Sequence, residues 1–286
     1  MKPRQIGLLF AIGAAFFFGF GNPFAKLAAQ NANVFVTTFY ISLIAGICFF
    51  LISLFRGSLK FLNSNDIWEY LKIGIIGFAI PQTLVMYAYT QTSAMNVLFL
   101  LRSEIFFATI FGAIIFREQI SRMQIGGILI GFAGVFIFST GLSFDSLNIA
   151  DAIVFFSTIF WALYVVFAKN LLGKLDAITI GGMRYWAAIP FQFILAISQD
   201  PTLSYPIAQI PSLAIFSIAT FVFGVILYNK AIEKLGVWKA VVPGQMLSII
   251  FGAVATFIVL GETLTAVKIA GGGLIIAGTL IALGKK

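Results

Sequence analysis

The chain has 286 residues, of which 60% are hydrophobic and only 10% are charged, and its mean hydropathy is +1.05. Soluble domains carry roughly 25% charged residues, so this composition excludes an ordinary water-facing globular protein. The net charge of +8 does not indicate a nucleic-acid partner, because basic residues gather in the cytoplasmic loops of membrane proteins. The sequence has no histidine, which excludes histidine-based metal sites and Ser-His catalysis.

Apolar runs of about 20 residues, the length needed to cross a bilayer core of about 30 Å, recur along the whole chain. Each run must be helical, because hydrocarbon offers no hydrogen-bond partner for free backbone groups. The predicted spans lie at roughly 6–29, 34–55, 67–90, 94–116, 122–140, 150–171, 177–198, 211–234, 238–260 and 266–284. The predicted fold class is therefore an all-α membrane protein with ten transmembrane helices. The spacing of Ser121 and Gln124 also predicts a capping box where the fifth span begins.

The first span carries two polar side chains, Asn22 and Lys26, which are four residues apart and therefore share a helix face. Pro23 lies between them and could free a backbone carbonyl for ligand binding. The alternative is that Lys26 only extends to the membrane interface and that Pro23 makes a tolerated kink. Both Asn22 and Lys26 are kept as candidate substrate contacts.

The fourth span contains an arginine and a glutamate within apolar sequence. If it begins near Ala94, a rise of about 1.5 Å per residue places Glu104 about 15 Å deep and Arg102 about 12 Å deep, near the middle of the bilayer. Glu104 is a candidate for proton binding or for pairing with a cationic substrate. The alternative is a structural ion pair with Arg102 or Arg184, although two residues that are two apart on one helix do not face each other.

The remaining candidates are polar or aromatic side chains within other spans. Arg184 lies about 10 Å into the seventh span, and its forked guanidinium suits a carboxylate or phosphate. Trp161 and Tyr164 share a face of the sixth span, and Gln245 and Ser248 share a face of the ninth. Packing and hydrogen bonding between helices are the alternatives for all of these. Further candidates of this kind are Gln82, Tyr87 and Asn96, and the aromatic residues Tyr89, Tyr185, Trp186 and Tyr228 could line the same cavity.

The placement of lysine and arginine predicts the orientation of the spans. If the N-terminus is cytoplasmic, 14 of the 18 basic residues fall on the cytoplasmic side, and only Lys26 and Lys268 lie near the outer side. We therefore expect a multi-pass protein of the plasma membrane with both termini in the cytoplasm. In the fifth span, Gly127 and Gly131 form a G-x-x-x-G motif, which indicates close helix packing or a homodimer interface.

The chain repeats itself at about half its length. The tripeptide Phe-Ala-Lys at 24–26 recurs at 167–169, and the segment that follows Glu118 recurs after Glu262. The expected domains are a first repeat at 1–143, with spans one to five, and a second repeat at 144–286, with spans six to ten. Each half has an odd number of spans, so the second half enters the membrane inverted. Inverted repeats of this kind are typical of secondary transporters, which bind substrate near the midplane between the halves.

The charged pair of the fourth span is not repeated. At an offset of about half the chain, Arg102 and Glu104 correspond to Met246 and Ser248, whereas Glu118 is matched by Glu262. We interpret the two repeated glutamates as acids that stabilise turns. A feature present in one half cannot be required by the architecture that both halves share, so the unrepeated pair is the stronger indication of function.

Four motifs carry a resemblance to a known family. They are G-F-G-N-P-F-A-K in the first span, L-L-R-S-E in the fourth, R-E-Q-I-S after the fourth and G-E-T-L-T after the ninth. In this order, the chain resembles the ten-helix EamA-type permeases of the drug/metabolite transporter superfamily. The resemblance implies two five-helix repeats around a central cavity and the export or exchange of a small metabolite. The chain departs from the family pattern at Ile105, where a proline often follows the glutamate, which leaves a kink in the fourth span open.

The predicted function is secondary active transport of a small metabolite, such as an amino acid or a related compound, across the plasma membrane by alternating access. Glu104 is the candidate for proton coupling. The expected partners are a small-molecule substrate and the lipid bilayer, with no nucleic acid, cofactor, metal or catalytic residue. The alternatives are a non-transporting membrane sensor, which normally carries a soluble domain, and an intramembrane enzyme, which needs a Ser-His pair, paired carboxylates or a metal motif that this sequence lacks.

Overall fold

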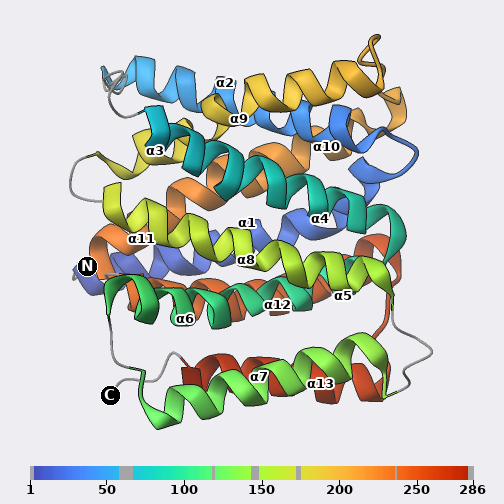
Figure 1. Cartoon of the computed structure of the whole chain (residues 1–286). Coiled ribbons are helices and arrows are strands. Elements are labelled where there is room, and N and C mark those ends of the chain that lie inside the picture. Colours follow the sequence, from blue (N-terminus) through green and yellow to red (C-terminus); the bar gives the residue numbers. More distant parts are fainter. Residues whose placement is uncertain are drawn as a thin grey trace.

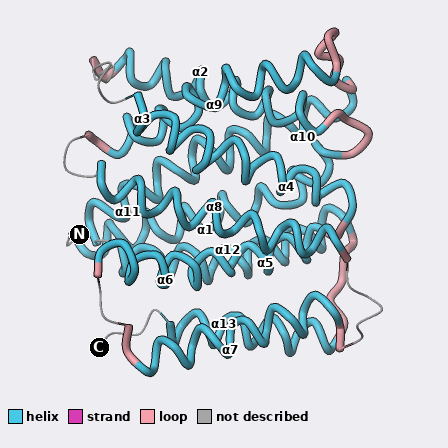
Figure 2. Tube along the Cα trace, viewed as in Figure 1, coloured by secondary structure: helices cyan, strands magenta, loops and turns pink. Residues whose placement is uncertain are grey.

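The computed structural model describes residues 3–57, 67–117, 120–142, 148–171, 175–235 and 237–282. These residues form a bundle of long helices that lie alongside one another and are joined by short connections (Figure 1). Within these ranges the chain forms no β-strand (Figure 2), in agreement with the need of a membrane span to satisfy its own backbone. The prediction of an all-α fold is therefore confirmed.

Most of the predicted spans are single helices, and three of them are built from consecutive helical segments. In chain order the elements are α1 (Pro3–Ala29), α2 (Val34–Phe55), α3 (Ile67–Leu71), η2 (Lys72–Ala79), α4 (Ile80–Gln91), α5 (Ala94–Leu100), η3 (Leu101–Ser103), α6 (Glu104–Phe116), α7 (Arg122–Thr140), α8 (Ile149–Leu171), α9 (Ala177–Gln199), η5 (Ile207–Gln209), α10 (Ile210–Phe216), η6 (Ser217–Gly224), α11 (Val225–Leu235), α12 (Val237–Leu260) and α13 (Ala266–Ala282). The η segments are 3₁₀ or π-helical. Helix α1 begins and helix α13 ends at the same end of the bundle, and we call the opposite end the far end (Figure 1).

Eight stretches of the described residues are long and apolar enough to cross a membrane, from Arg4–Ala29 at the start of the chain to Ile207–Leu235. Two further apolar stretches, Met246–Leu260 and Ala266–Ala282, are shorter. The chain is therefore a multi-pass membrane protein. The total of ten spans stays a prediction.

Several helices begin at side chains that accept hydrogen bonds from the free backbone N–H groups of the first turn. The predicted capping box is confirmed: Gln124 N donates to Ser121 Oγ (3.2 Å), and Ser121 N donates to Gln124 Oε1 (2.9 Å). At the start of α9, Asp176 accepts from the backbone N–H groups of Ile178 and Thr179. Burial raises the pKa of Asp176, but the hydrogen bonds from Thr179 and Ile178 outweigh burial and hold the pKa of this carboxyl below its ordinary value.

The third and eighth predicted spans contain π-helical segments at matching places. Segment η2 lies between α3 and α4, and segment η6 lies between α10 and α11. In the first case Pro81 is the second residue of α4, just after the π segment, and its missing N–H removes one α-helical hydrogen bond. Such segments often mark functional sites, and here each one leads into a helix that lines the central cavity.

The helices pack in a scheme that occurs twice. Helix α1 packs against α11 and α12, and helix α8 packs in the same way against α4 and α6. The pairs α2 with α9 and α7 with α13 each join one helix of the first half to one of the second. If the two halves of the chain are exchanged, α8 takes the place of α1 and α4 takes the place of α11. The same pairs of helices are then in contact. The contacts therefore follow the repeat that the sequence shows.

Glycines allow the backbones of α7 and α13 to approach closely along the lower edge of the bundle in Figure 1. A Cβ added at Gly134 would lie 2.6 Å from the backbone N of Ile275, and one added at Gly127 would lie 2.8 Å from the carbonyl O of Gly278. No side chain fits at these distances. The G-x-x-x-G stripe is therefore used for packing within the chain.

Replacing Gly134 with Ala should lower the free energy of unfolding by about 1–3 kcal/mol, because the added methyl group meets the backbone of α13. Gly126→Ala is the matched control on the same helix, since a Cβ at Gly126 meets nothing within 4 Å. Alanine favours a helix over glycine by about 1 kcal/mol, so this control should be neutral or stabilising. Unfolding in a denaturing detergent, followed by circular dichroism, measures both, and equal stability of the two variants would contradict the packing argument.

Candidate functional site

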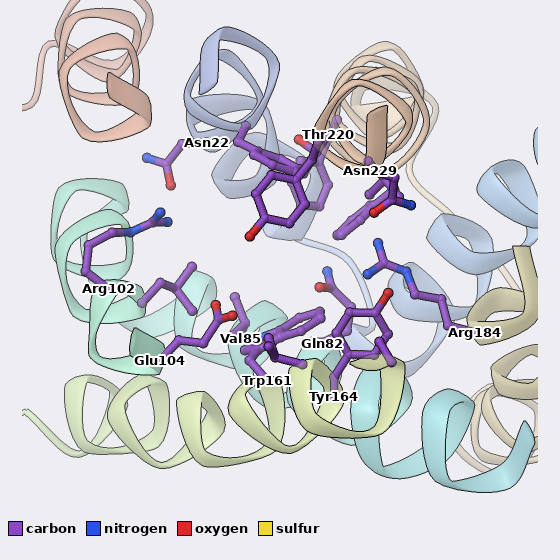
Figure 3. Close-up of a pocket in the computed structure, with 18 of the residues that line it drawn as sticks. Asn22, Gln82, Val85, Arg102, Glu104, Trp161, Tyr164, Arg184, Thr220 and Asn229 are labelled. Carbon is purple, nitrogen blue, oxygen red and sulfur yellow. The ribbon is translucent and has the colours of Figure 1, made fainter. Parts of the chain in front are cut away.

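A cavity of about 240 Å³ lies at the centre of the bundle, between helices of both halves (Figure 3). Apolar and aromatic side chains form most of its wall, and a small number of polar and charged groups interrupt them. The lining residues are Phe18, Asn22, Gln82, Val85, Tyr89, Leu98, Leu101, Arg102, Glu104, Trp161, Tyr164, Val165, Ala168, Ile180, Arg184, Phe216, Thr220, Phe221, Val225, Tyr228, Asn229 and Ile232. A concave apolar site with few polar groups is the usual form of a small-molecule binding site.

One side of the cavity carries Arg102 and Glu104 (Figure 3). The 3₁₀ segment η3 tightens the helix just before Glu104, which begins α6. Arg102 is only 9% exposed, and it donates from Nε to Leu98 O (3.3 Å) and from Nη1 to Ser248 Oγ (3.1 Å). Among the described residues no salt bridge joins Glu104 to Arg102, as their spacing predicts, or to Arg184. The carboxylate of Glu104 therefore faces the cavity, and no cation among the described residues forms a salt bridge with it.

The opposite side of the cavity carries Arg184, which is 5% exposed and surrounded by aromatic rings (Figure 3). Its Cζ lies 5.1 Å from the ring centre of Phe78, 5.2 Å from Tyr164, 4.7 Å from Tyr185 and 5.8 Å from Phe221. Its Nη2 donates to the hydroxyl of Tyr185, which in turn donates to Phe221 O at 3.0 Å. Cation–π contacts of about 0.5–2 kcal/mol each can hold a guanidinium out of water. Arg184 is therefore fixed in place on this side of the cavity.

Three buried donors on this side have no hydrogen-bond partner among the described residues. They are Nε of Arg184, Nε2 of Gln82 and Oγ1 of Thr220. Gln82 is 2% exposed, and all three side chains line the cavity away from Glu104 (Figure 3). A buried donor without an acceptor costs about 1–3 kcal/mol, so such groups are rare unless a ligand satisfies them. Arg184 and Gln82 therefore suit a ligand group that is rich in acceptors, such as a carboxylate.

Apolar and aromatic surfaces lie between the two polar sides. Trp161 stands at the wall next to Tyr164 and packs edge to face on Phe78, with ring centres 5.8 Å apart. Phe18 and Tyr228 pack on each other across the boundary between α1 and α11 (5.9 Å). Aromatic walls of this kind take up an apolar body, and the polar groups at either side fix its orientation.

A family comparison decides the kind of protein to which this site belongs. The model of the EamA-like transporter family matches the chain twice, over residues 5–140 and over residues 148–284. The chain belongs to the EamA-like transporter family. The resemblance seen in the sequence motifs is therefore confirmed.

Individual relatives of this EamA family member are also named as transporters. An "Uncharacterized transporter" of Methanothermobacter thermautotrophicus is 26% identical over 97% of this chain and 86% of its own. A "Probable amino-acid metabolite efflux pump" of Salmonella typhimurium is 25% identical over 63% of this chain and 64% of its own. One solved crystal structure shares the fold, with a TM-score of 0.68, 14% identity and 96% coverage of each chain. These names fit a membrane transporter rather than an enzyme.

The structure brings most of the predicted site residues together. Those that line the cavity of this EamA family member are Asn22, Gln82, Arg102, Glu104, Trp161, Tyr164 and Arg184, together with the aromatic residues Tyr89 and Tyr228. Four candidates, Lys26, Tyr87, Asn96 and Ser248, are not among the lining residues. Glu118 and the side chains of Lys169 and Gln245 lie outside the described residues.

Each of the four candidates outside the cavity has a physical reason for its place. Lys26 donates to carbonyl oxygens at the end of α4. Asn96 belongs to a buried hydrogen-bond cluster at the far end. Ser248 accepts a hydrogen bond from Arg102. Tyr87 is 43% exposed, because it lies two residues from Tyr89 and so points to the opposite side of α4. In this structure the four side chains therefore lie outside the cavity lining, and a role of theirs in substrate binding stays a prediction.

Some lining residues were not singled out from the sequence. Thr220 lies within the π-helical segment η6, in an apolar run where a threonine carries no distinguishing signal. Phe18 and Val85 are apolar residues in apolar spans, so their sequence context does not separate them from packing residues. Asn22 was found, but its amide is fully used: it donates to Ala94 O (3.0 Å) and to Thr256 Oγ1 (2.9 Å) and accepts from Tyr89 Oη (2.6 Å).

Replacing Tyr89 with Phe should lower the free energy of unfolding by about 1–3 kcal/mol, because the buried Oδ1 of Asn22 loses its donor. Tyr87→Phe, two residues away on the exposed face, is the matched control and should change stability by less than about 0.5 kcal/mol. Thermal unfolding in mild detergent, followed by tryptophan fluorescence, compares the two. A Tyr89→Phe midpoint equal to that of Tyr87→Phe would show that the Tyr89–Asn22 hydrogen bond contributes nothing to stability.

Proposed function

We propose that this protein is a secondary active transporter that moves a small amphipathic metabolite, such as an amino acid or a related compound, across the plasma membrane by alternating access. The family and the names of its relatives support the transport of a small molecule. The observation that carries the proposal is the central cavity, with Glu104 on one side and Arg184 on the other (Figure 3).

The depth of the two charged residues supports a substrate site near the middle of the bilayer. Glu104 is ten residues from Ala94, at the far end, which corresponds to a depth of about 15 Å. Arg184 is seven residues from Ala177, at the end of the bundle that holds the termini, which corresponds to about 10 Å. Both side chains therefore reach the central part of a core of about 30 Å.

The chemistry of the cavity favours a zwitterion with an apolar body. A ligand carboxylate next to Arg184 and Gln82 satisfies the unused donors, and an ammonium group next to Glu104 supplies the missing cation. The rings of Trp161 and Tyr228 line the space between. The volume of about 240 Å³ is below the range of about 300–1,000 Å³ typical of drug-sized ligands, which favours a small metabolite.

The arrangement of the halves supports alternating access. Residues of both family-matched segments line the cavity, and the packing scheme of one half recurs in the other. Two inverted repeats around a central site can exchange their conformations, so that the site opens first to one side and then to the other. The bias of basic residues supports cytoplasmic termini, as in the sequence argument. The relative named as an efflux pump for amino-acid metabolites supports export.

Flux of radiolabelled amino acids into liposomes that contain the purified protein tests the proposal directly. A panel of neutral, acidic and basic amino acids, with sugars for comparison, should show saturable flux of at least one neutral amino acid. Arg184→Lys should raise the apparent KM about tenfold, because lysine cannot hold a carboxylate with two parallel hydrogen bonds. Lys72→Arg, at a surface ion pair with Glu69, is the matched control and should leave flux unchanged. Absence of flux for every compound in the panel would contradict the proposal.

Glu104→Gln tests the coupling role of the carboxylate. If Glu104 carries the coupling proton, the variant should lose flux driven by a pH gradient, while exchange of labelled for unlabelled substrate persists with a raised apparent KM, because the substrate ammonium loses its carboxylate partner. Glutamine has the size of glutamate but takes up no proton, so the two activities separate. Glu69→Gln, which removes a surface carboxylate, should keep both. Unchanged gradient-driven flux in Glu104→Gln would remove this residue from the coupling mechanism.

A further inference from the structure

The connection between α4 and α5, residues 89–96, lies at the far end of the bundle (Figure 1). Charged side chains from four other parts of the chain bind it. They are Lys26 of α1, Asp151 of α8, Glu262 of the turn after α12 and Lys268 of α13. We call these four side chains the far-end clamp. Three of them belong to the second half of the chain, whereas the connection belongs to the first.

Glu262 binds the start of α5 with both carboxylate oxygens. Its Oε1 accepts from Ala94 N (3.0 Å), and its Oε2 accepts from Met95 N (2.9 Å). Gly261, with a φ of +68°, makes the turn that ends α12 and brings the carboxylate to this place. Two free N–H groups at a helix start, where the helix dipole is positive, form a strong site for a carboxylate. Glu262, interpreted from the sequence as an acid that stabilises a turn, thus binds the helix start that follows a turn of the other half.

Asp151 binds the same connection from α8. This carboxylate is 2% exposed and accepts from Thr92 Oγ1 (2.6 Å), from Asn96 Nδ2 (2.9 Å) and from Ser139 Oγ (3.2 Å). Lys268 Nζ donates to Asn96 Oδ1 (2.8 Å), so the amide of Asn96 joins a cation of α13 to an anion of α8. These groups form one connected cluster across the boundary between the halves.

Lys26 binds the end of α4. Its Nζ donates to Tyr89 O (2.5 Å) and to Thr92 O (2.8 Å), which are carbonyl groups at and just beyond the last turn of that helix. A cation at a helix C-terminus binds free carbonyls and interacts favourably with the helix dipole. The end of α4 and the start of α5 are therefore both held by side chains of the matching charge.

The clamp closes the cavity at the far end. Tyr89 lines the cavity and also accepts from Lys26 through its carbonyl, and Asn22 lines it and donates to Ala94 O. The clamped connection therefore covers the cavity at the far end.

We propose that the far-end clamp is the gate of the transporter on the far side: it is closed in this structure and must release Ala94, Met95 and Thr92 each time the site opens to that side. This inference rests on the proposed function. Glu262 and Asp151 are positioning residues of the closed gate, because they bind the moving connection and do not line the cavity. Removing a contact that forms in only one of two conformations lowers the population of that conformation.

Accessibility of a cavity residue from each side of the membrane tests the gate. The protein has a single cysteine, Cys48, so Cys48→Ser with Val85→Cys places one reporter thiol in the cavity wall. A membrane-impermeant maleimide is added to right-side-out or to inverted membrane vesicles, and a tag at the C-terminus identifies the far side. Glu262→Gln and Asp151→Asn should each raise labelling from the far side about tenfold and lower it from the side of the termini. Glu69→Gln, which breaks a surface ion pair, should change neither rate.

A purely structural role for the clamp gives a different result. Lower thermal stability of Glu262→Gln with no change in the ratio of labelling from the two sides would overturn the proposal. If both variants fail to fold, the reporter protein that keeps the clamp intact decides the question: adding a transported amino acid should raise labelling from the far side during turnover, and an unchanged rate would overturn the gate.

The labelling ratio and the flux separate the two proposals. A changed ratio in a protein that carries no amino acid keeps the gate and removes the proposed substrate class. Flux of an amino acid with an unchanged ratio in Glu262→Gln keeps the function and removes the gate.

Discussion

The cost of holding a charge inside a lipid bilayer determines where the functional groups of this protein can lie. Four charged side chains inside the described part of the bundle each have a partner of a different kind. Arg184 lies among aromatic rings, Arg102 binds a carbonyl and Ser248, and Lys26 binds the carbonyls that end α4. Asp151 takes its hydrogen bonds from hydroxyl and amide groups. Glu104 differs from them, because no salt bridge within the described residues joins its carboxylate to a cation. The cavity therefore has an anionic side at Glu104 and a cationic side at Arg184.

The two halves share a scaffold but not a site. Helices of one half pack as their counterparts in the other half do, and both halves contain a π-helical segment before a helix that lines the cavity. The charged pair of the fourth span occurs once. At the corresponding place the second half has Ser248, and in the folded chain this serine accepts a hydrogen bond from Arg102. Ser248 of the second half, which is uncharged, thus helps to hold the charged Arg102 of the first half in place.

At the far end, side chains of the second half bind the connection between α4 and α5 of the first half. Glu262 reaches across the boundary between the halves and binds the N–H groups that begin α5, while Asp151 and Lys268 meet at Asn96. These contacts are short, carry charge and lie outside the cavity. In the proposed mechanism, Glu262, Asp151 and Lys268 therefore close the far end without lining the cavity, so its lining could change without altering these contacts.

Much of this fold can be predicted from the sequence, because a segment that crosses the bilayer must be an apolar helix of about 20 residues. Apolar runs give the helices, the spacing of Ser121 and Gln124 gives a capping box, and counting residues gives the depth of Glu104. The tertiary structure alone decided which polar side chains share the cavity. Lys26 and Arg184 are both intramembrane cations, yet only Arg184 lines it. The reason is distance along the chain: Glu262 meets Ala94 across 168 residues, and no local pattern specifies such a contact.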